Sequence, residues 1–181
     1  MANSDKKNPN YNPNSIHYID LDLEKFANRL ANNVERNTFI QETIDNIRHY
    51  LQVDRVVLYY FYREWKGQVT FESLSDGELS IYGSTGADEC FNDEYAAMYQ
   101  HGRVRAMENI ELEPIHSCHR DFLRSIQVKA NLVAPVLNSR SLWGLLVAHQ
   151  CKNIRPWLKS DIEVMQKAAI TLATAPIIRD S

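Results

Sequence analysis

The chain carries three cysteines, whose thiols are the side chains best suited to covalent chemistry. Cys90, Cys118 and Cys151 form neither an even set nor a C-x-x-C pair, so a disulfide scaffold and a structural zinc site are not indicated. Cys118 falls where we expect the first turn of a short helix, and the partial positive charge of a helix N-terminus stabilises a thiolate. Most free cysteines are buried and inert, so spacing alone leaves a structural role for Cys118 open.

Two histidines, His116 and His119, flank Cys118 and suggest a cysteine–histidine nucleophile or a metal site. Adjacent residues on a helix point about 100° apart, so Cys118 and His119 are not expected to act as a catalytic pair. A large planar ligand bonded to Cys118 could nevertheless contact His119 at the same time. The cluster therefore favours an attached ligand over a catalytic dyad.

Hydrophobic periodicity predicts an α/β (α+β) framework around these residues. Apolar spacings of three and four predict helices over residues 21–36, 38–51, 93–99, 117–126 and 160–175. Dense β-branched and aromatic runs predict strands over residues 55–62, 68–74, 128–137 and 142–150, with a turn at Lys66-Gly67. In this order the elements predict two hairpins in a central antiparallel sheet flanked by helices.

Local signals predict where the helices begin and end. Thr38 can cap a helix, so we expect a pause near Asn37 between the first two helices. Ser160 followed by Glu163 has the spacing of a capping box and predicts the start of the last helix. Pro176 is expected to end that helix, because proline cannot continue it.

The composition indicates one ordinary globular domain, since 44% of the 181 residues are hydrophobic and 24% are charged. A formal net charge of −3 without a clustered basic face argues against nucleic-acid binding. Apolar runs are far shorter than the roughly 20 residues that cross a bilayer, and no signal peptide is recognisable, so we expect a cytoplasmic protein without membrane insertion. We assign residues 1–20 to a flexible leader and residues 21–178 to the domain.

Five short strings in the second half of the chain are distinctive: SCH at 117–119, FL at 122–123, QVKANLV at 127–133, LWGLL at 142–146 and AHQ at 148–150. Together they resemble the signature of cyanobacteriochrome GAF domains, which are photoreceptors of the phytochrome superfamily. The resemblance runs from about residue 21 to residue 172 and includes DRV at 54–56 and RPW at 155–157. It implies a GAF fold with a chromophore pocket on one face of the sheet.

The resemblance implies that Cys118 anchors a linear tetrapyrrole, phycocyanobilin or phycoviolobilin, through a thioether to its A ring. His119 would then lie against the ring system, and Tyr99 and Phe122 would line the slot. His149 resembles the family histidine near the D ring, which rotates about the C15=C16 bond after photoexcitation. From the residues alone, a buried core histidine is the alternative for His149.

The string DECF at residues 88–91 resembles the D-x-C-F motif of the dual-cysteine subfamily. The resemblance implies that Cys90 forms a second, light-dependent thioether at C10, and that Asp88 accepts hydrogen bonds from pyrrole nitrogens, with Phe91 beside them. Addition at C10 interrupts conjugation and gives a blue-absorbing state, whereas release restores a green or longer-wavelength state. A loop-capping role for Asp88 and an idle Cys90 are the alternatives.

Arg103 and Arg105 alternate in sequence, so they share a face if this stretch is extended. The two propionates of a bilin require cationic partners, and either arginine could supply one. Simple exposure to solvent is the alternative for each.

The function that follows is a photoreceptor sensory domain and not an enzyme, apart from isomerisation of its own phycocyanobilin to phycoviolobilin. Two other classes stay open: a methionine sulfoxide reductase of the GAF type, with Cys90 and Cys118 as the redox pair, and a GAF module that binds a small effector without a covalent bond. The terminal helices could join two copies in a homodimer or lead to an output domain in a longer parent protein.

Overall fold

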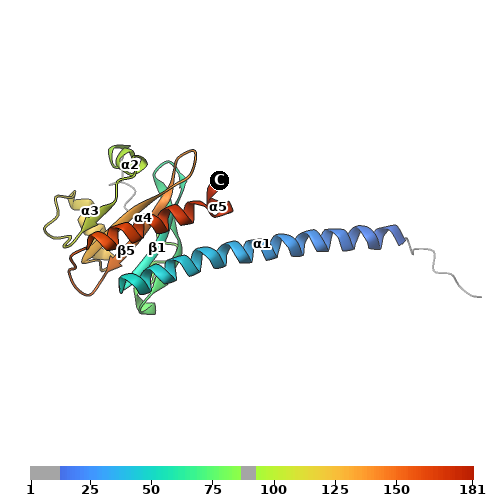
Figure 1. Cartoon of the computed structure of the whole chain (residues 1–181), viewed down its shortest axis with the longest axis horizontal. Helices are drawn as coiled ribbons and strands as arrows, with labels where there is room; N and C mark the ends of the chain where they lie inside the picture. Colours follow the sequence, from blue (N-terminus) through green and yellow to red (C-terminus); the bar gives the residue numbers. More distant parts are fainter. Residues whose placement is uncertain (1–12, 87–92) are drawn as a thin grey trace, which may run out of the picture. The chain divides into compact units, whose positions relative to one another are not determined.

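The computed structural model of the protein describes residues 13–86 and 93–181 (Figure 1). These residues cluster into two units that divide between Asn37 and Thr38. In the first unit the described residues are helical and form the N-terminal part of α1 (Pro13–Leu51). The second unit, residues 38–181, contains the end of α1 and all the other described helices and strands.

α1 is one helix where the sequence analysis predicts two. It begins at Pro13, so residues 13–20, which we assigned to a flexible leader, are helical, and it continues through Asn37 and Thr38. Proline is well tolerated in the first turn of a helix, and Asn and Thr keep the backbone N–H that an internal proline would lack. The predicted pause near Asn37 is therefore wrong, although the compact unit begins at the next residue.

Five antiparallel strands form one sheet in the order β2-β1-β5-β4-β3. They are β1 (Arg55–Arg63), β2 (Lys66–Leu74), β3 (Arg105–Met107), β4 (Ala130–Leu137) and β5 (Leu142–Gln150). The predicted fold class, a central antiparallel sheet flanked by helices, is confirmed, as are both hairpins. β3 has no counterpart in the sequence analysis because three residues are too few to show a period.

The first hairpin turns at Glu64 and Trp65, two residues before the predicted turn at Lys66-Gly67. Trp65 takes the left-handed conformation in this turn, with a φ of 55°. Gly67 lies inside β2, where an added Cβ would be 2.1 Å from the carbonyl oxygen of Tyr60. Close contact between the strands, and not the turn, therefore requires this glycine.

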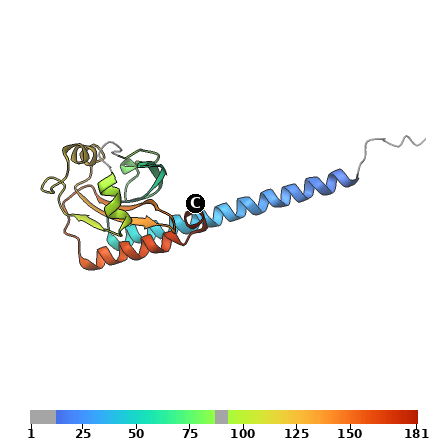
Figure 2. The same cartoon turned by 90° about the horizontal axis from the view of Figure 1, so that it is seen from above.

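Different elements cover the two faces of the sheet. α4 (Lys159–Ala173) and the last turns of α1 cover one face (Figure 1, Figure 2). They enclose the main hydrophobic core, which includes Ile44, Leu51, Val56, Leu58, Leu132, Leu146, Met165 and Leu172. α2 (Asp93–Gln100) and α3 (Ser117–Ser125) belong to the other side of the sheet. Side chains alternate along each strand, so one set packs into the main core and the next set faces α2 and α3.

The start of α4 differs from the predicted capping box at Ser160 and Glu163. The cap position is Leu158, whose backbone N–H donates to the carboxylate of Asp161 at 3.2 Å. Arg155 also donates to this buried carboxylate at 3.2 Å and so holds it in the capping position. Asp161 therefore takes the acidic position of the capping interaction, and the helix starts at Lys159.

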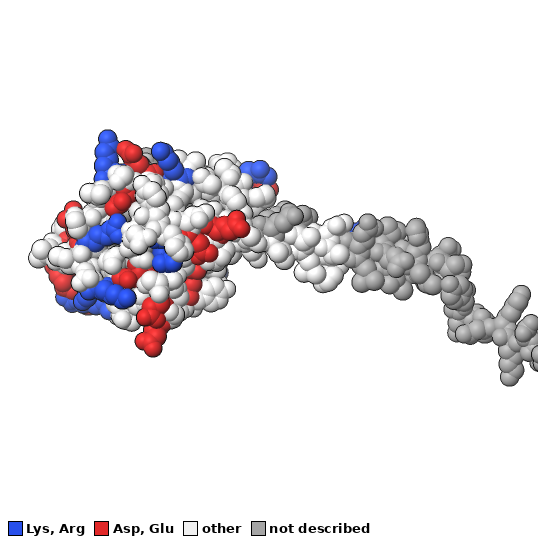
Figure 3. All heavy atoms as spheres, turned by 60° about the horizontal axis from the view of Figure 1, so that its bottom comes forward, with Lys and Arg blue, Asp and Glu red and all other residues white. Residues whose placement is uncertain are grey.

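Two short helices complete the described elements, η1 (Gly77–Leu79) and α5 (Pro176–Arg179). α4 ends before Pro176, as predicted, and the proline begins α5. Over the face drawn in Figure 3, basic and acidic side chains are interspersed. Within the described part of the chain, no helix has both the length and the apolar character needed to cross a membrane.

Candidate functional site

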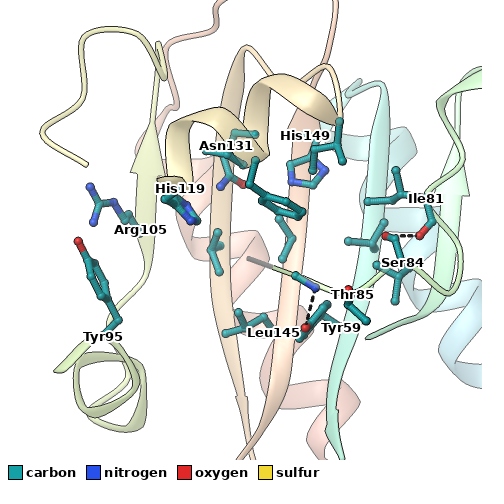
Figure 4. Close-up of a pocket in the computed structure, with 18 of the residues that line it drawn as sticks. Tyr59, Ile81, Ser84, Thr85, Tyr95, Arg105, His119, Asn131, Leu145 and His149 are labelled. Carbon is teal, nitrogen blue, oxygen red and sulfur yellow. Dashed lines mark hydrogen bonds between the residues drawn. The ribbon is translucent and has the colours of Figure 1, made fainter. Parts of the chain in front are cut away.

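A cavity lies between the sheet and the elements on the side away from α4 (Figure 4). Its walls come from β1, β4, β5, α2, α3 and residues 81–86, and most of them are apolar or aromatic: Val57, Tyr59, Phe61, Ile81, Tyr95, Tyr99, Phe122, Leu123, Val133, Leu145 and Val147. A cavity of this kind suits a largely apolar, planar ligand. Among residues 13–86 and 93–181, no three histidine, cysteine or carboxylate side chains lie close enough together to hold a metal ion.

A few polar side chains line this apolar cavity, and they come from four elements. They are His119 on α3, Arg105 on β3, Asn131 on β4 and His149 on β5. Figure 4 shows His119, Asn131 and His149 facing the same space. Polar groups that are few and convergent orient a ligand whose affinity comes from apolar contact.

His149 is buried and is held by Arg55 on the neighbouring strand β1. The Nε–H of Arg55 donates to Nδ1 of His149 at 3.0 Å. Arg55 is buried as well, and its other two nitrogens donate to the carbonyl oxygens of Leu79 at 2.5 Å and Ile126 at 2.9 Å. Burial is the main cause that lowers the pKa of His149 well below its ordinary value, and the positive charge of Arg55 adds to the effect. His149 is therefore neutral at physiological pH.

His119 is a second neutral imidazole in the cavity. Burial is the main cause that lowers its pKa to about 4, and the charge of Arg105 adds to the effect. Arg105 itself lies 4.0 Å from the carboxylate of Glu113. Burial also raises the pKa of Tyr99 to about 12, so the tyrosine keeps its proton. The cavity thus offers neutral hydrogen-bonding groups and one cation.

Cys118 lies in the first turn of α3, where the sequence analysis expects a helix start. His116 is the cap residue, and its Nδ1 accepts from the backbone N–H of Cys118 at 3.3 Å and lies 3.1 Å from its sulfur. Cys118 is half-buried, and the next residue, His119, lines the cavity. A cysteine in the first turn of a helix therefore directly precedes a side chain that lines the cavity.

The structure brings together many of the predicted site residues. His119, His149, Arg105, Tyr99 and Phe122 all line the cavity. Cys118 and Arg103 are not among the residues that line it, and the predicted site residues Asp88, Cys90 and Phe91 lie outside the described residues.

Arg103 and Arg105 do not share a face of an extended segment as the sequence analysis supposes. Arg103 is exposed and contacts the sulfur of Met98, and its backbone N–H donates to the carbonyl oxygen of Met98 in the turn that follows α2. The strand β3 begins only at Arg105. Of the two arginines, Arg105 alone therefore lines the cavity.

Three residues of the site region were missed by sequence reasoning: Tyr59, Asn131 and Arg55. Tyr59 and Asn131 line the cavity, and Arg55 holds His149 from behind. Their signal was the alternation along each strand, since residues 55, 57 and 59 share one face of β1. That alternation shows which residues share a face of the strand, but it does not show which face lines the cavity.

Comparison with known proteins identifies the family. The GAF domain family matches residues 35–175. The chain belongs to the GAF domain family. A relative of this GAF domain is an uncharacterized protein of Picosynechococcus sp., which is 50% identical over 155 residues, or 86% of this chain and 95% of the relative.

A more distant relative of this GAF domain is the circadian input-output histidine kinase CikA of Synechocystis sp., which is 28% identical over 202 aligned positions. The match covers 97% of this chain but only 27% of that protein. The chain therefore spans about a quarter of the length of this relative.

Solved structures of photoreceptor GAF domains are similar to this one. The cyanobacteriochrome receptor PixJ matches with a TM-score of 0.74 and 29% identity over 83% of this chain and 99% of that one. The blue-light absorbing form of the Thermosynechococcus elongatus PixJ GAF domain has a TM-score of 0.70 and 30% identity over 79% and 88%. A phycocyanobilin-bound GAF domain from a cyanobacterial phytochrome has a TM-score of 0.69 and 27% identity over 86% and 93%.

Proposed function

We propose that this GAF domain is a photoreceptor sensory domain that binds a linear tetrapyrrole covalently. The observation that carries the proposal is a cysteine in the first turn of α3 beside an aromatic cavity with two neutral histidines, of which His149 is buried and His119 half-buried. The similarity to GAF domains described as phycocyanobilin-bound and as cyanobacteriochromes supports the same assignment.

The residues of the cavity fit such a pigment. Its aromatic and aliphatic walls suit a long conjugated ring system, and Arg105 can pair with a propionate. The side-chain oxygen of Asn131 is buried without a hydrogen-bond partner in the described structure, and a pyrrole N–H would satisfy it. When bound, phycocyanobilin or phycoviolobilin supplies the absorption of light and the double bond at C15 that isomerises between Z and E.

Cys118 is the proposed anchor. In its reduced form, its thiol would add across the exocyclic double bond of the A ring, so that a carbon–sulfur bond forms at the side-chain carbon, a proton is added at the ring carbon of that double bond, and nothing leaves. The N-terminus of α3 favours the thiolate, and Nδ1 of His116, 3.1 Å from the sulfur, is placed to accept the proton. His119, one residue further on, then lies against the attached ring system.

Cys90 is the proposed second, light-dependent ligand. Its sulfur would bond to C10 while its proton is transferred to the conjugated system, and release would reverse both changes. Asp88, two residues earlier, would accept hydrogen bonds from pyrrole nitrogens. Interrupting conjugation at C10 gives the blue-absorbing state, and restoring it gives the green or longer-wavelength state.

The domain is proposed to act as a sensor and not as an enzyme, apart from isomerising its own phycocyanobilin to phycoviolobilin. A cytoplasmic location, a homodimer through the terminal helices and an output domain in a longer parent protein belong to the same proposal. Its relative CikA is named as a histidine kinase, and this chain covers 27% of it, which agrees with a sensory module attached to other domains.

The proposal is tested by producing the protein together with phycocyanobilin and recording absorption before and after blue light. Acid denaturation and zinc-induced fluorescence of the denatured band report a covalent pigment. We expect a reversible loss of a blue band with a gain at longer wavelength. Absence of any covalent pigment would overturn the proposal and favour a redox enzyme or a non-covalent effector module.

Single substitutions separate the roles of the three cysteines. Cys118→Ala is expected to abolish covalent attachment, and Cys90→Ala to keep the pigment but remove the blue band. Cys151→Ala is the matched control, because this buried cysteine is free and follows the end of β5. A blue band that persists in Cys90→Ala would remove Cys90 from the photocycle without affecting the role of Cys118.

A further inference from the structure

The edge strand β3 lies between the cavity and the main hydrophobic core. Arg105 and Met107 line the cavity, and Ala106, between them, packs against the main core on the other face of the sheet. Met107 is 1% exposed and packs in a cluster with Leu123 of α3, the helix that also contains Cys118. A displacement of α3, or of a ligand in the cavity, therefore acts directly on β3.

The end of β3 is held by a short segment that follows β5. The indole Nε1–H of Trp157 donates to the carbonyl oxygen of Met107 at 3.0 Å, and the backbone N–H of Arg155 donates to the carbonyl oxygen of Glu108 at 3.0 Å. Trp157 is 8% exposed, so its bond to Met107 is shielded from water. Breaking this bond leaves a buried donor without a partner, which opposes separation of β3 from the segment.

The side chain of Arg155 joins the same segment to the ends of two helices. Its Nη1 donates to the carbonyl oxygen of Leu51, the last residue of α1, at 2.5 Å. Its Nη2 donates to the carboxylate of Asp161, in the first turn of α4, at 3.2 Å. The last carbonyl oxygens of a helix have no acceptor role within it, and a cation is favourable at that end. Arg155 thus ties the end of α1 to the start of α4.

Arg155 and Trp157 also contact each other. The central guanidinium carbon of Arg155 lies 4.8 Å from the centroid of the Trp157 ring, which is the distance of a cation–π contact. Pro156, between them, restricts the backbone of the segment. These three residues, which we call the 155–157 clamp, therefore hold the end of β3, the end of α1 and the start of α4 together.

The hydrogen bonds of the clamp respond to small movements of β3. Helices α1 and α4 also pack on the sheet through apolar side chains such as Ile44 and Met165, and apolar contact is non-directional. Hydrogen bonds are directional and weaken steeply as their angle falls below about 120°. A displacement of β3 must therefore either break the bonds of the clamp or move the clamp, and movement of the clamp displaces the helix ends.

We propose that the 155–157 clamp transmits changes in the cavity to the end of α1 and the start of α4. A shift of β3 moves Trp157 through its bond to Met107, and Arg155 passes the movement to Leu51 and Asp161. The link between strand and helices is a property of the protein alone. That light is the event that displaces β3 rests on the proposed function.

The first test uses the protein without pigment and measures amide hydrogen exchange. Trp157→Phe removes the donor to Met107 and keeps an aromatic ring. We expect exchange to become several-fold faster in β3 and also in the last turn of α1 and the first turn of α4. Trp143→Phe is the matched control and should leave these three segments unchanged, because the buried Nε1 of Trp143 has no hydrogen-bond partner in the described structure. Faster exchange confined to β3 in Trp157→Phe would overturn the link.

Arg155→Met tests the helix side of the clamp. This variant removes the side-chain donors but keeps an aliphatic chain over Trp157 and the backbone N–H that donates to Glu108. We expect several-fold faster exchange at the end of α1 and the start of α4, with β3 unchanged. Arg179→Met, at an arginine whose side chain is 60% exposed, is the control. Wild-type exchange at both helix ends in Arg155→Met would show that Arg155 does not hold them.

The second test uses protein loaded with phycocyanobilin. In the wild type we expect illumination to change exchange at the end of α1 and the start of α4. In Trp157→Phe and Arg155→Met the absorption change on illumination should persist, while the exchange difference at the helix ends should fall several-fold. Should one variant not fold, the other decides. An exchange difference as large as that of the wild type would overturn the proposal.

The outcomes for the wild type separate this proposal from the proposed function. A protein that photoconverts without any change of exchange at the helix ends would overturn transmission through the clamp and leave the photoreceptor assignment intact. Failure to bind pigment or to respond to light would instead overturn the proposed function. The link measured without pigment would then still stand or fall on the exchange of Trp157→Phe.

Discussion

The hydroxyl of Tyr59 on β1 accepts a hydrogen bond from the backbone N–H of Gly86 at 2.9 Å. Tyr59 lines the cavity, and Gly86 is the last described residue before residues 87–92, which include Asp88 and Cys90. An added Cβ at Gly86 would lie 2.9 Å from the same hydroxyl oxygen, so the contact leaves little space. The sheet therefore holds the chain where the segment with the proposed second ligand begins.

Tyr59→Phe should release this attachment. A typical intramolecular hydrogen bond contributes about 1 kcal/mol, so we expect amide hydrogen exchange at Gly86 to become several-fold faster. Tyr62→Phe is the matched control, because Tyr62 is on the same strand and 53% exposed. Exchange at Gly86 that is unchanged in Tyr59→Phe would show that the hydroxyl does not hold the segment.

Stability should fall as the pH is lowered, because His119 is buried in its neutral form. Its folded-state pKa of about 4 lies below the ordinary value of 6.5, so between these values the unfolded chain binds a proton that the folded chain does not. The free energy of unfolding therefore decreases as the pH falls through this window, and His149 contributes in the same direction.

Urea unfolding at pH 7.5 and pH 5.5 measures the effect, and His119→Gln should lose less stability between them than the wild type. His101→Gln, at an exposed histidine outside the cavity, should behave as the wild type. Equal losses in all three proteins would contradict the account of His119.

Met165→Ala should be strongly destabilising. Met165 is on α4, is 0% exposed, and lies in the core between that helix and the sheet. Truncation of a buried residue of this size typically costs about 2–5 kcal/mol, because apolar contact is lost and a cavity remains. Ile170→Ala, on the same helix but 69% exposed, should change the free energy of unfolding by about 0.5 kcal/mol or less. Similar losses for the two variants in urea unfolding would contradict the packing of α4.

Gly144→Ala tests the close contact between β5 and β1. An added Cβ at Gly144 would lie 2.1 Å from the carbonyl oxygen of Tyr59, so the strands would have to separate. We expect the free energy of unfolding to fall by about 1–3 kcal/mol. Gly77→Ala is the control, since nothing lies within 4 Å of the position of its added Cβ. A thermal midpoint of Gly144→Ala equal to that of Gly77→Ala would show that the strands can accommodate a methyl group.

Much of the fold follows from patterns that act over a few residues. The strand predicted over residues 142–150 coincides with β5, and the helix predicted over residues 117–126 differs from α3 by one residue. Dense β-branched and apolar runs between polar turns leave little choice of structure. The resemblance of short strings such as SCH and AHQ also indicated the family and several residues that line the cavity.

Other features were wrong or missing in the sequence analysis because distant residues decide them. Pairing with β4 forms the three-residue strand β3, which is too short to show a pattern of its own. Arg103 and Arg105 look equivalent in sequence, yet only the second lines the cavity, since the strand begins at that residue. Local propensity carries no information on such contacts.

The sequence by itself determined the types of most elements, the antiparallel hairpins and a cysteine next to a histidine at a helix start, because each depends on neighbours in the chain. The tertiary structure alone decided that Arg55 meets His149, 94 positions away, and that Asn131 stands beside them. Register between strands makes these contacts, and a shift of one residue would turn each side chain to the opposite face of the sheet. The contact between Arg55 and His149, and the neighbouring Asn131, therefore exist only in the folded protein.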